Sequence, residues 1–241
     1  MAFPTIRTAG FDGFLVTFGD SLSDATNRAT LAFRAAVERA RPEGVIETST
    51  SLVSAYLRFD PLSVSHADLR AEIEALLSGH DWAGEPMPEG RSLWRVPVAF
   101  GGEAGPQLAE AAGLAGMSEE QAIASITGAR TRVQTIGFAP GMPYLGELPP
   151  EWDIPRQSKL TAEVPMGGLC VAIRQLVLFP NNTPTGWRHI GQTRLRLFRP
   201  DADVPFILKP GDEVAFEAVT PEALDAIGDD PNGGAVREDM S

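Results

Sequence analysis

The stretch Gly137-Phe-Ala-Pro-Gly-Met-Pro-Tyr-Leu-Gly-Glu-Leu-Pro149 decides the fold of this 241-residue chain. Proline fixes φ and removes a hydrogen-bond donor, and glycine opens positive φ, so the three prolines and three glycines here specify a rigid shape. Ordinary surface loops recruit polar residues, whereas this one has no charge before Glu147. Such a loop lines a pocket or is a buried connection between two sheets, and the pattern alone leaves both interpretations open.

The net charge of −12 argues against nucleic acid and anionic membrane surfaces as partners, because both repel an acidic protein. The single cysteine, Cys170, lies in an apolar run, which excludes a disulfide framework and predicts a buried, reduced thiol. The N-terminus has no signal-peptide pattern, and no run approaches the ~18 apolar residues that a membrane helix needs. We therefore expect a cytoplasmic protein without a membrane segment.

The first hundred residues alternate between strand-like and helix-like patterns. Apolar residues recur at a period of two in the strands and 3.6 in the helices, and Asp24 and Ser65 mark the helix starts. The order is β-α-β-β-α-β, so we predict a small ferredoxin-like α/β domain over residues 1–90, with a linker at 79–92. The last strand fits this domain or the next one. The predicted elements are strand 14–18, helix 24–40, strands 45–50 and 52–59, a helix over 66–77, and strand 94–100.

From Gly101 onward the chain shows two short helical patterns, after which the helical periodicity disappears. Short apolar strands recur instead, separated by proline and glycine, and this spacing is typical of an all-β barrel or sandwich. Small and polar residues over 226–241 predict a flexible tail. The predicted elements are helices 107–114 and 119–125 and strands 133–138, 169–173, 176–179, 195–198, 206–208 and 213–218.

Motifs for metal, nucleotide and covalent chemistry are missing from the sequence. The three histidines, His66, His80 and His189, lie far apart and form no metal-ligand pattern. Neither Gly-x-Ser-x-Gly nor Gly-x-x-x-x-Gly-Lys-[Ser/Thr] occurs, and Cys170 lacks a nucleophile signature. We therefore predict no metal site and no nucleotide loop in this chain, and the catalytic residues stay unassigned.

A set of polar side chains accompanies the apolar loop in the second half. Arginine presents a planar fork that suits carboxylates and phosphates, and glutamine and threonine can bind a neutral amide or lactam. Such groups beside an apolar loop suit a small polar ligand. The alternative is that Arg156 and Arg188 are solvated or form surface ion pairs, and that Trp187 belongs to the core. The candidate pocket residues are Glu103, Phe138, Pro140, Met142, Tyr144, Arg156, Gln175, Arg188 and Thr193.

Six motifs occur together in one order: Val96-Pro-Val-Ala-Phe-Gly-Gly-Glu103, Gly137–Gly146, Pro155-Arg156, Thr185-Gly-Trp187, Ile190-Gly-Gln-Thr193 and Leu208-Lys-Pro-Gly-Asp212. In this order and spacing they closely resemble the KipI/allophanate hydrolase subunit 1 family. The loop at Gly137–Gly146 is the specific part of the resemblance, and the N-terminal half fits through its layout and length.

The resemblance implies an α+β fold, with a cyclophilin-like β-barrel over residues 91–241 after the small N-terminal domain. It also implies a subunit of a heteromeric ATP-dependent amide or lactam hydrolase. Family members include the B subunit of 5-oxoprolinase, an enzyme that converts 5-oxo-L-proline to L-glutamate with ATP and water, and allophanate hydrolase subunit 1. The implied partners are a second cyclophilin-like subunit, similar to KipA or allophanate hydrolase subunit 2, and a TIM-barrel-like subunit. ATP would be bound with or by these partners, and related fused domains form the carboxyltransferase part of urea carboxylase.

The chain departs from the family pattern at several positions. Met142 stands where the family has an aromatic residue, Gln107 where it has aspartate, and Leu176-Val177 where it has Thr-Gly. A lost hydrogen bond to a buried polar ligand group costs about 1–3 kcal/mol, which is up to about two decades in affinity. The fold survives such changes, while the identity of the substrate stays open.

Two further functions remain as alternatives. Other relatives inhibit a sporulation histidine kinase, so the chain could be a non-enzymatic regulator that inhibits a sensor histidine kinase. A prolyl isomerase is suggested only by analogy with the cyclophilin fold, and fold does not imply function. The cyclophilin active-site pattern is missing from this sequence.

Overall fold

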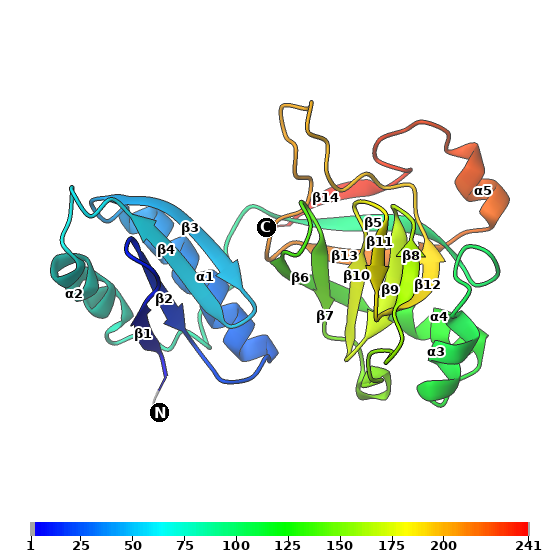
Figure 1. Cartoon of the computed structure of the whole chain (residues 1–241), viewed down its shortest axis with the longest axis horizontal. Coiled ribbons are helices and arrows are strands. Elements are labelled where there is room, and N and C mark those ends of the chain that lie inside the picture. Colours follow the sequence, from blue (N-terminus) through cyan, green and yellow to red (C-terminus); the bar gives the residue numbers. More distant parts are fainter. Residues whose placement is uncertain (1–2, 241) are drawn as a thin grey trace. The chain divides into compact units, whose positions relative to one another are not determined.

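The computed structural model describes residues 3–240, which form two compact units divided between Glu89 and Gly90 (Figure 1). Each unit has its own β-sheet and its own hydrophobic core, and the predicted α+β class is confirmed. Residues 1, 2 and 241, which the predicted domains and tail include, lie outside the described residues. No helix within residues 3–240 is both long and apolar enough to cross a membrane.

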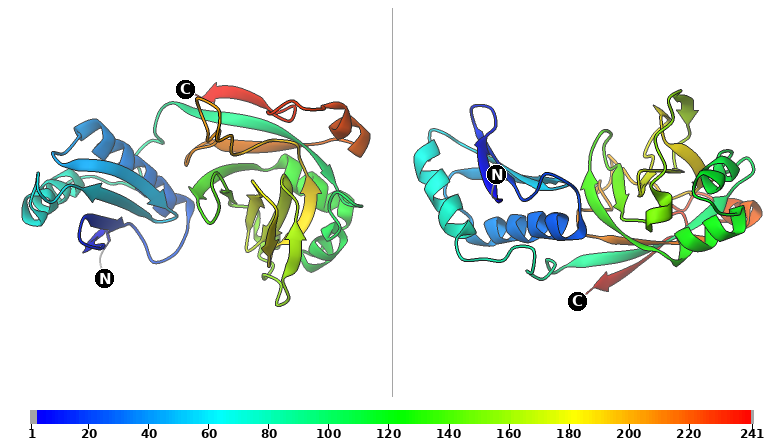
Figure 2. Two further views of the ribbon diagram at one scale, coloured as in Figure 1. Left: turned by 45° about the horizontal axis from the view of Figure 1, so that its top comes forward. Right: turned by 90° about the horizontal axis from the view of Figure 1, so that it is seen from below.

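Unit 1 is an antiparallel sheet with two helices. Its elements are β1 (Thr5–Thr8), β2 (Gly13–Thr17), α1 (Asp24–Ala40), β3 (Val45–Ser51), β4 (Ser54–Phe59) and α2 (His66–Leu77). The strand order is β1-β2-β4-β3, so β4 lies between the two strands that α1 connects, and α1 runs along one face of the sheet (Figure 2). Phe14 and Val16 of β2 are buried together with apolar residues of both helices. The ring of Trp82 meets Phe33 of α1 edge to face, at a centroid distance of 5.4 Å.

Unit 1 differs from the predicted βαββαβ order at its edge. The last predicted strand, 94–100, lies in unit 2, and the place beside β2 is taken by β1. The sequence analysis did not identify β1, because this strand is half polar and has no buried residue. The ferredoxin-like assignment is therefore not confirmed. The predicted linker 79–92 is also wrong in part, since Trp82 is buried in the core of unit 1 and β5 begins at Arg91.

Unit 2 is a closed barrel of seven strands, which confirms the predicted β-barrel. Its elements are β5 (Arg91–Phe100), α3 (Leu108–Leu114), α4 (Glu119–Gly128), β6 (Arg130–Ile136), β7 (Pro143–Gly146), the 3-10 helix η1 (Pro150–Trp152), β8 (Thr161–Val164), β9 (Gly168–Ala172), β10 (Gln175–Leu178), β11 (Thr183–Thr185), β12 (Arg188–Gln192), β13 (Glu213–Ala218), α5 (Pro221–Ala226) and β14 (Val236–Met240). The barrel order is β12-β9-β10-β7-β6-β13-β5, and pairing of β12 with β5 closes the ring. Strands β8 and β11 form a separate two-stranded sheet.

Strand β5 has the most partners in the barrel. One edge of β5 pairs in parallel with β13, from Leu93 opposite Glu213 to Val98 opposite Ala218. The other edge is shared, because β14 pairs with the first half of β5 and β12 with its last two residues. Alternate side chains of β5 and the apolar sides of α3 and α4 belong to one core inside the barrel.

Three predictions for unit 2 are wrong. The supposed tail contains β14, which pairs with β5 through its backbone and through an ion pair of 2.6 Å between Arg95 Nε and Glu238 Oε1. The predicted strands 195–198 and 206–208 are not strands, and only a single bridge joins Phe198 to Phe206. The second half of the apolar loop is strand β7, which lies between β6 and β10.

Candidate functional site

An apolar cluster lies on the outer face of the barrel, apart from the core inside it. Side chains alternate along β9, so Val171 belongs to the inner core while Cys170 and Ala172 belong to the outer cluster. The outer cluster also receives Trp187, which precedes β12. Its members are Met142, Val164, Cys170, Ala172, Val177, Phe179 and Trp187, with Ala139 and Tyr144 packed against them.

Arg156 lies over the ring of Trp187 at the surface of this cluster. The guanidinium carbon is 5.3 Å from the ring centroid, a distance at which the positive charge is attracted to the ring face. Tyr144 meets Trp187 edge to face at a centroid distance of 5.9 Å. Arg156 is exposed and forms no ion pair within residues 3–240. The ring therefore supports a guanidinium whose N–H groups are available to a carboxylate.

The segment that carries Arg156 is fixed to the start of β12 by its backbone. The amide of Gln157 donates to the carbonyl oxygen of Gly186 at 2.7 Å. The carbonyl oxygen of Pro155 accepts from Arg188 Nη1 at 2.6 Å. Both neighbours of Arg156 are thus held, so its side chain starts from a defined position above Trp187.

Two glutamine side chains extend this connection to α3. Gln107 Nε2 donates to Gln157 Oε1 at 2.8 Å, and Gln107 Oε1 accepts from the amide of His189 at 2.9 Å. Gln157 Nε2 also donates to the carbonyl oxygen of Trp187 at 3.0 Å. The sequence analysis did not select either glutamine as a site residue. The only signal was that Gln107 replaces the aspartate of the family motif and that Gln157 follows Arg156.

Two of the predicted pocket residues use their polar groups inside the fold. Arg188 is buried, and its Nε donates to Glu110 Oε1 at 2.9 Å. Gln175 is buried as well, and its Nε2 donates to Gln134 Oε1 at 2.6 Å. Gly146 leaves room for this pair, because a Cβ there would stand 2.6 Å from Gln134 Oε1. Arg188 therefore supports the segment of Arg156 rather than presenting a free guanidinium.

The other predicted residues are spread over unit 2. Phe138, at 79% exposure, and Pro140 form the exposed turn before β7. Glu103 is exposed between β5 and α3, and Thr193 is buried beside a separate cavity after β12. The structure thus brings Met142, Tyr144 and Arg156 together around Trp187. We call this group, with Trp187 included, the Arg156 site.

The phenol and the thiol near the Arg156 site are neutral at neutral pH. Burial raises the pKa of the Tyr144 phenol, and the charge of Arg156 opposes this shift. Burial also raises the pKa of the Cys170 thiol far above its usual range, so this buried cysteine is not a thiolate nucleophile. No group of three or more His, Cys, Asp or Glu within the described residues could hold a metal ion. The site is therefore suited to binding and orienting a ligand.

His189 makes the stability of unit 2 depend on pH. Burial lowers its pKa, opposed by hydrogen bonds to Gly191 and Gln192, and Nε2 lies 3.0 Å from the Gly191 carbonyl oxygen. In the unfolded chain the pKa of this histidine is about 6.5, which is higher than in the folded chain. As the pH falls below about 6.5, the unfolded state binds a proton that the folded state does not, and the folded state loses stability relative to it. We expect the free energy of unfolding in urea to fall between about pH 7.5 and about pH 5.5, and to fall less in His189→Gln. The same pH dependence in both proteins would contradict this role.

A comparison with protein-family models identifies the family. Residues 4–208 match the model of the carboxyltransferase domain, subdomain C and D. The chain belongs to this carboxyltransferase family. The resemblance found in the sequence motifs is thereby confirmed, and the matched region includes β5 through β12 and the whole Arg156 site.

Relatives of this family member differ in length. This chain is 30% identical over 237 residues to the 5-oxoprolinase B subunit of Bacillus subtilis, and the match covers 94% of this chain and 98% of the relative. The crystal structure of TTHA0988 has 30% identity and a TM-score of 0.71, and covers 90% of this chain but 41% of that one. The urea carboxylase of Kluyveromyces lactis has 18% identity and a TM-score of 0.72, over 98% of this chain and 24% of that one, and shows the fold alone. This chain thus spans less than half of these two longer chains.

Proposed function

We propose that this carboxyltransferase family member is the B subunit of an ATP-dependent 5-oxoprolinase, which opens the lactam of 5-oxo-L-proline to L-glutamate. One observation carries the proposal. The chain is 30% identical to the Bacillus subtilis protein that bears this name, and the match covers 98% of that protein. The likeness therefore includes both units and not the barrel alone.

The Arg156 site supports the substrate class. 5-Oxo-L-proline joins a small ring, a lactam and a carboxylate in one molecule. Arg156 offers a partner for the carboxylate, and the rings of Trp187 and Tyr144 offer apolar surface for the substrate ring. Allophanate, which is acyclic, also carries a carboxylate but has no ring to place on this surface.

Partner subunits and ATP belong to the same proposal. The relative is named as one subunit of its enzyme, which supports a heteromer. We assign the partner roles to a second cyclophilin-like subunit and a TIM-barrel-like subunit. We assign ATP to those partners, because this sequence has no Gly-x-x-x-x-Gly-Lys-[Ser/Thr] loop to hold the phosphates. The cytoplasm stays the predicted location, and inhibition of a histidine kinase stays a prediction that no observation favours.

Co-expression with the products of the neighbouring genes tests the proposed function. We expect a purified complex that hydrolyses ATP only when 5-oxo-L-proline is present, with L-glutamate detected by glutamate dehydrogenase. The complex without this chain is the control and should be inactive. A folded complex that turns over allophanate or urea, but not 5-oxo-L-proline, would overturn the assignment.

A further inference from the structure

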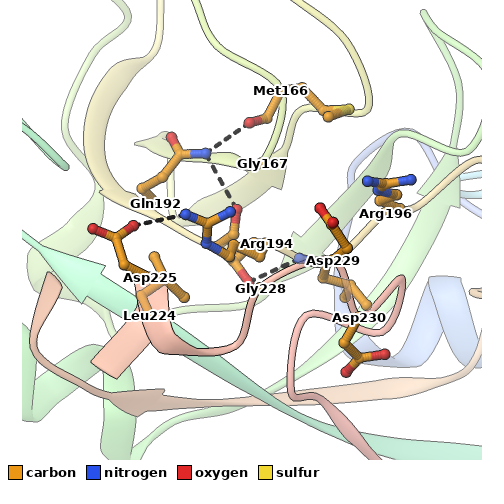
Figure 3. A pocket seen from close by; sticks show the side chains of 12 residues that line it. Met166, Gly167, Gln192, Arg194, Arg196, Leu224, Asp225, Gly228, Asp229 and Asp230 are labelled. Carbon is orange, nitrogen blue, oxygen red and sulfur yellow. Dashed lines mark hydrogen bonds and ion pairs between the residues drawn. The ribbon is translucent and has the colours of Figure 1, made fainter. Parts of the chain in front are cut away.

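A cavity of about 300 Å³ lies in the C-terminal part of unit 2 and shares no residue with the Arg156 site. Its walls come from the turn at Met166-Gly167, from residues 192–196, and from residues 224–230 around the end of α5 (Figure 3). A cavity of this size accommodates a small metabolite. Thr193 lines it, and is the one candidate from the sequence analysis that does.

The backbone of this cavity is held in place. Gly167 has a φ of +83°, and a Cβ at this position would overlap the carbonyl oxygen of Thr193. The amide of Thr193 donates to the carbonyl oxygen of Gly167 at 2.9 Å. The amide of Arg196 donates to the carbonyl oxygen of Pro231 at 3.2 Å, which ties the wall at 192–196 to the residue directly after the wall at 224–230. The charged side chains of the cavity therefore stand on a fixed frame.

Charges of both signs line the cavity. Arg194 and Asp225 form an exposed ion pair of 2.7 Å on one side of the view in Figure 3, and Arg196 and Asp229 lie on the other side. Within residues 3–240, the side chains of Arg196 and Asp229 have neither an ion pair nor a hydrogen bond. Asp230 instead accepts from the amides of its own turn, and these hydrogen bonds lower its pKa. One guanidinium and one carboxylate are thus available to a ligand.

This combination selects a ligand that carries both charges. We propose that the cavity binds a small zwitterion, an α-amino acid, with its carboxylate against Arg196 and its ammonium group against Asp229. A nucleoside triphosphate would be repelled by the three aspartates of the lining. A ligand with one charge would leave either Arg196 or Asp229 without a partner. The inference uses only the charges of this cavity and holds whether or not the chain acts on 5-oxo-L-proline.

Isothermal titration calorimetry on the full chain tests the proposal, with L-serine, L-alanine, sodium acetate and ethylamine as titrants. We expect both amino acids to bind at least about tenfold more tightly than acetate or ethylamine. Acetate supplies only the negative charge and ethylamine only the positive charge, whereas an amino acid supplies both. Arg196→Ala and Asp229→Asn should each weaken amino-acid binding by about tenfold or more. Arg70→Ala, on the exposed face of α2, is the matched control and should bind as the native chain does.

The variants also separate this cavity from the Arg156 site. Circular dichroism confirms that each variant is folded, and Arg156→Ala should retain amino-acid binding. Absence of binding to the native chain at millimolar concentrations of either amino acid would overturn the proposal. Binding that survives both Arg196→Ala and Asp229→Asn, or that is lost in Arg156→Ala, would also overturn it.

Discussion

Arg156→Ala is expected to lower kcat/KM for the proposed substrate, 5-oxo-L-proline, about 100-fold in the assembled complex, through loss of a charge-assisted pair with the carboxylate of that substrate. The side chain is exposed and contributes to folding mainly through its position over Trp187, a contact worth about 0.5–1 kcal/mol at an exposed site. The variant should therefore remain folded and should still join the complex. ATP hydrolysis at increasing substrate concentrations, combined with urea unfolding of the isolated chain, measures both effects.

Two control variants test whether the expected loss of activity is specific to the guanidinium group of Arg156. Arg156→Lys keeps the positive charge but loses the planar fork, so it should recover only part of the activity. Arg70→Ala removes an exposed arginine from a helix of unit 1 and should leave kcat/KM unchanged. If Arg156→Ala keeps native kcat/KM, the Arg156 site does not bind the substrate, although the chain can still be a subunit of the enzyme.

Gly105→Ala is expected to destabilise unit 2 by about 3 kcal/mol, which corresponds to a Tm lower by roughly 10 °C. A Cβ at Gly105 would overlap the carbonyl group of Ile190, and a backbone group cannot move aside as a side chain can. The segment that connects β5 to α3 would therefore have to move away from β12. The hydrogen bond of 2.9 Å from the amide of Gln107 to the carbonyl oxygen of His189 would then be lost. Differential scanning calorimetry measures the change.

Gly113→Ala provides the matched control in the same part of the chain. A Cβ at Gly113, inside α3, has open space around it, and alanine favours a helix interior by up to about 1 kcal/mol. This variant should keep or raise the Tm. If Gly105→Ala and Gly113→Ala have the same Tm, the close approach of Gly105 to β12 is not important for stability.

The helices were predicted well from local patterns. A capping residue and an apolar side can both be recognised within one short stretch of sequence. Ser65 accepts from the amide of Asp68 at 3.1 Å, as the sequence indicated. Ser118 caps α4 in the same way and accepts from the amide of Gln121 at 3.2 Å. Helix α1 begins with Ser23 as its cap instead of Asp24, a difference of one residue. The barrel strands β5, β6, β9, β10 and β13 were also predicted, because their apolar residues form short, separate runs, whereas β7 and β12 were missed.

Two of the missed strands, β1 and β14, are held by their backbones and not by apolar alternation. Four of the five residues of β14 are exposed, so its sequence contains no sign of the pairing with β5. The opposite error occurred over 195–198, where Leu195 and Leu197 are buried and alternate with arginines. Their side chains pack into the core, but the amide of Arg196 bonds to a turn at Pro231 and not to a neighbouring strand.

The candidate site was predicted only in its local part. Met142, Tyr144 and Arg156 were selected from residue type and motif, and the structure places them around Trp187. The partner of Arg188 is Glu110, which lies 78 residues away in the sequence. A single sequence contains no information on such a pair, and for that reason an inward arginine could not be distinguished from a ligand-binding one.

The pairing of β5 has a consequence for the order in which the chain folds. This strand is the first of unit 2 to be synthesised, yet its partners begin at residues 188, 213 and 236. During translation, unit 1 can fold while both edges of β5 are still unpaired, because the strands that pair with them have not yet been synthesised. Contacts between segments so distant in sequence make folding slow, and unpaired apolar strands aggregate. A chaperone that shields β5 during this interval would raise the yield of native protein.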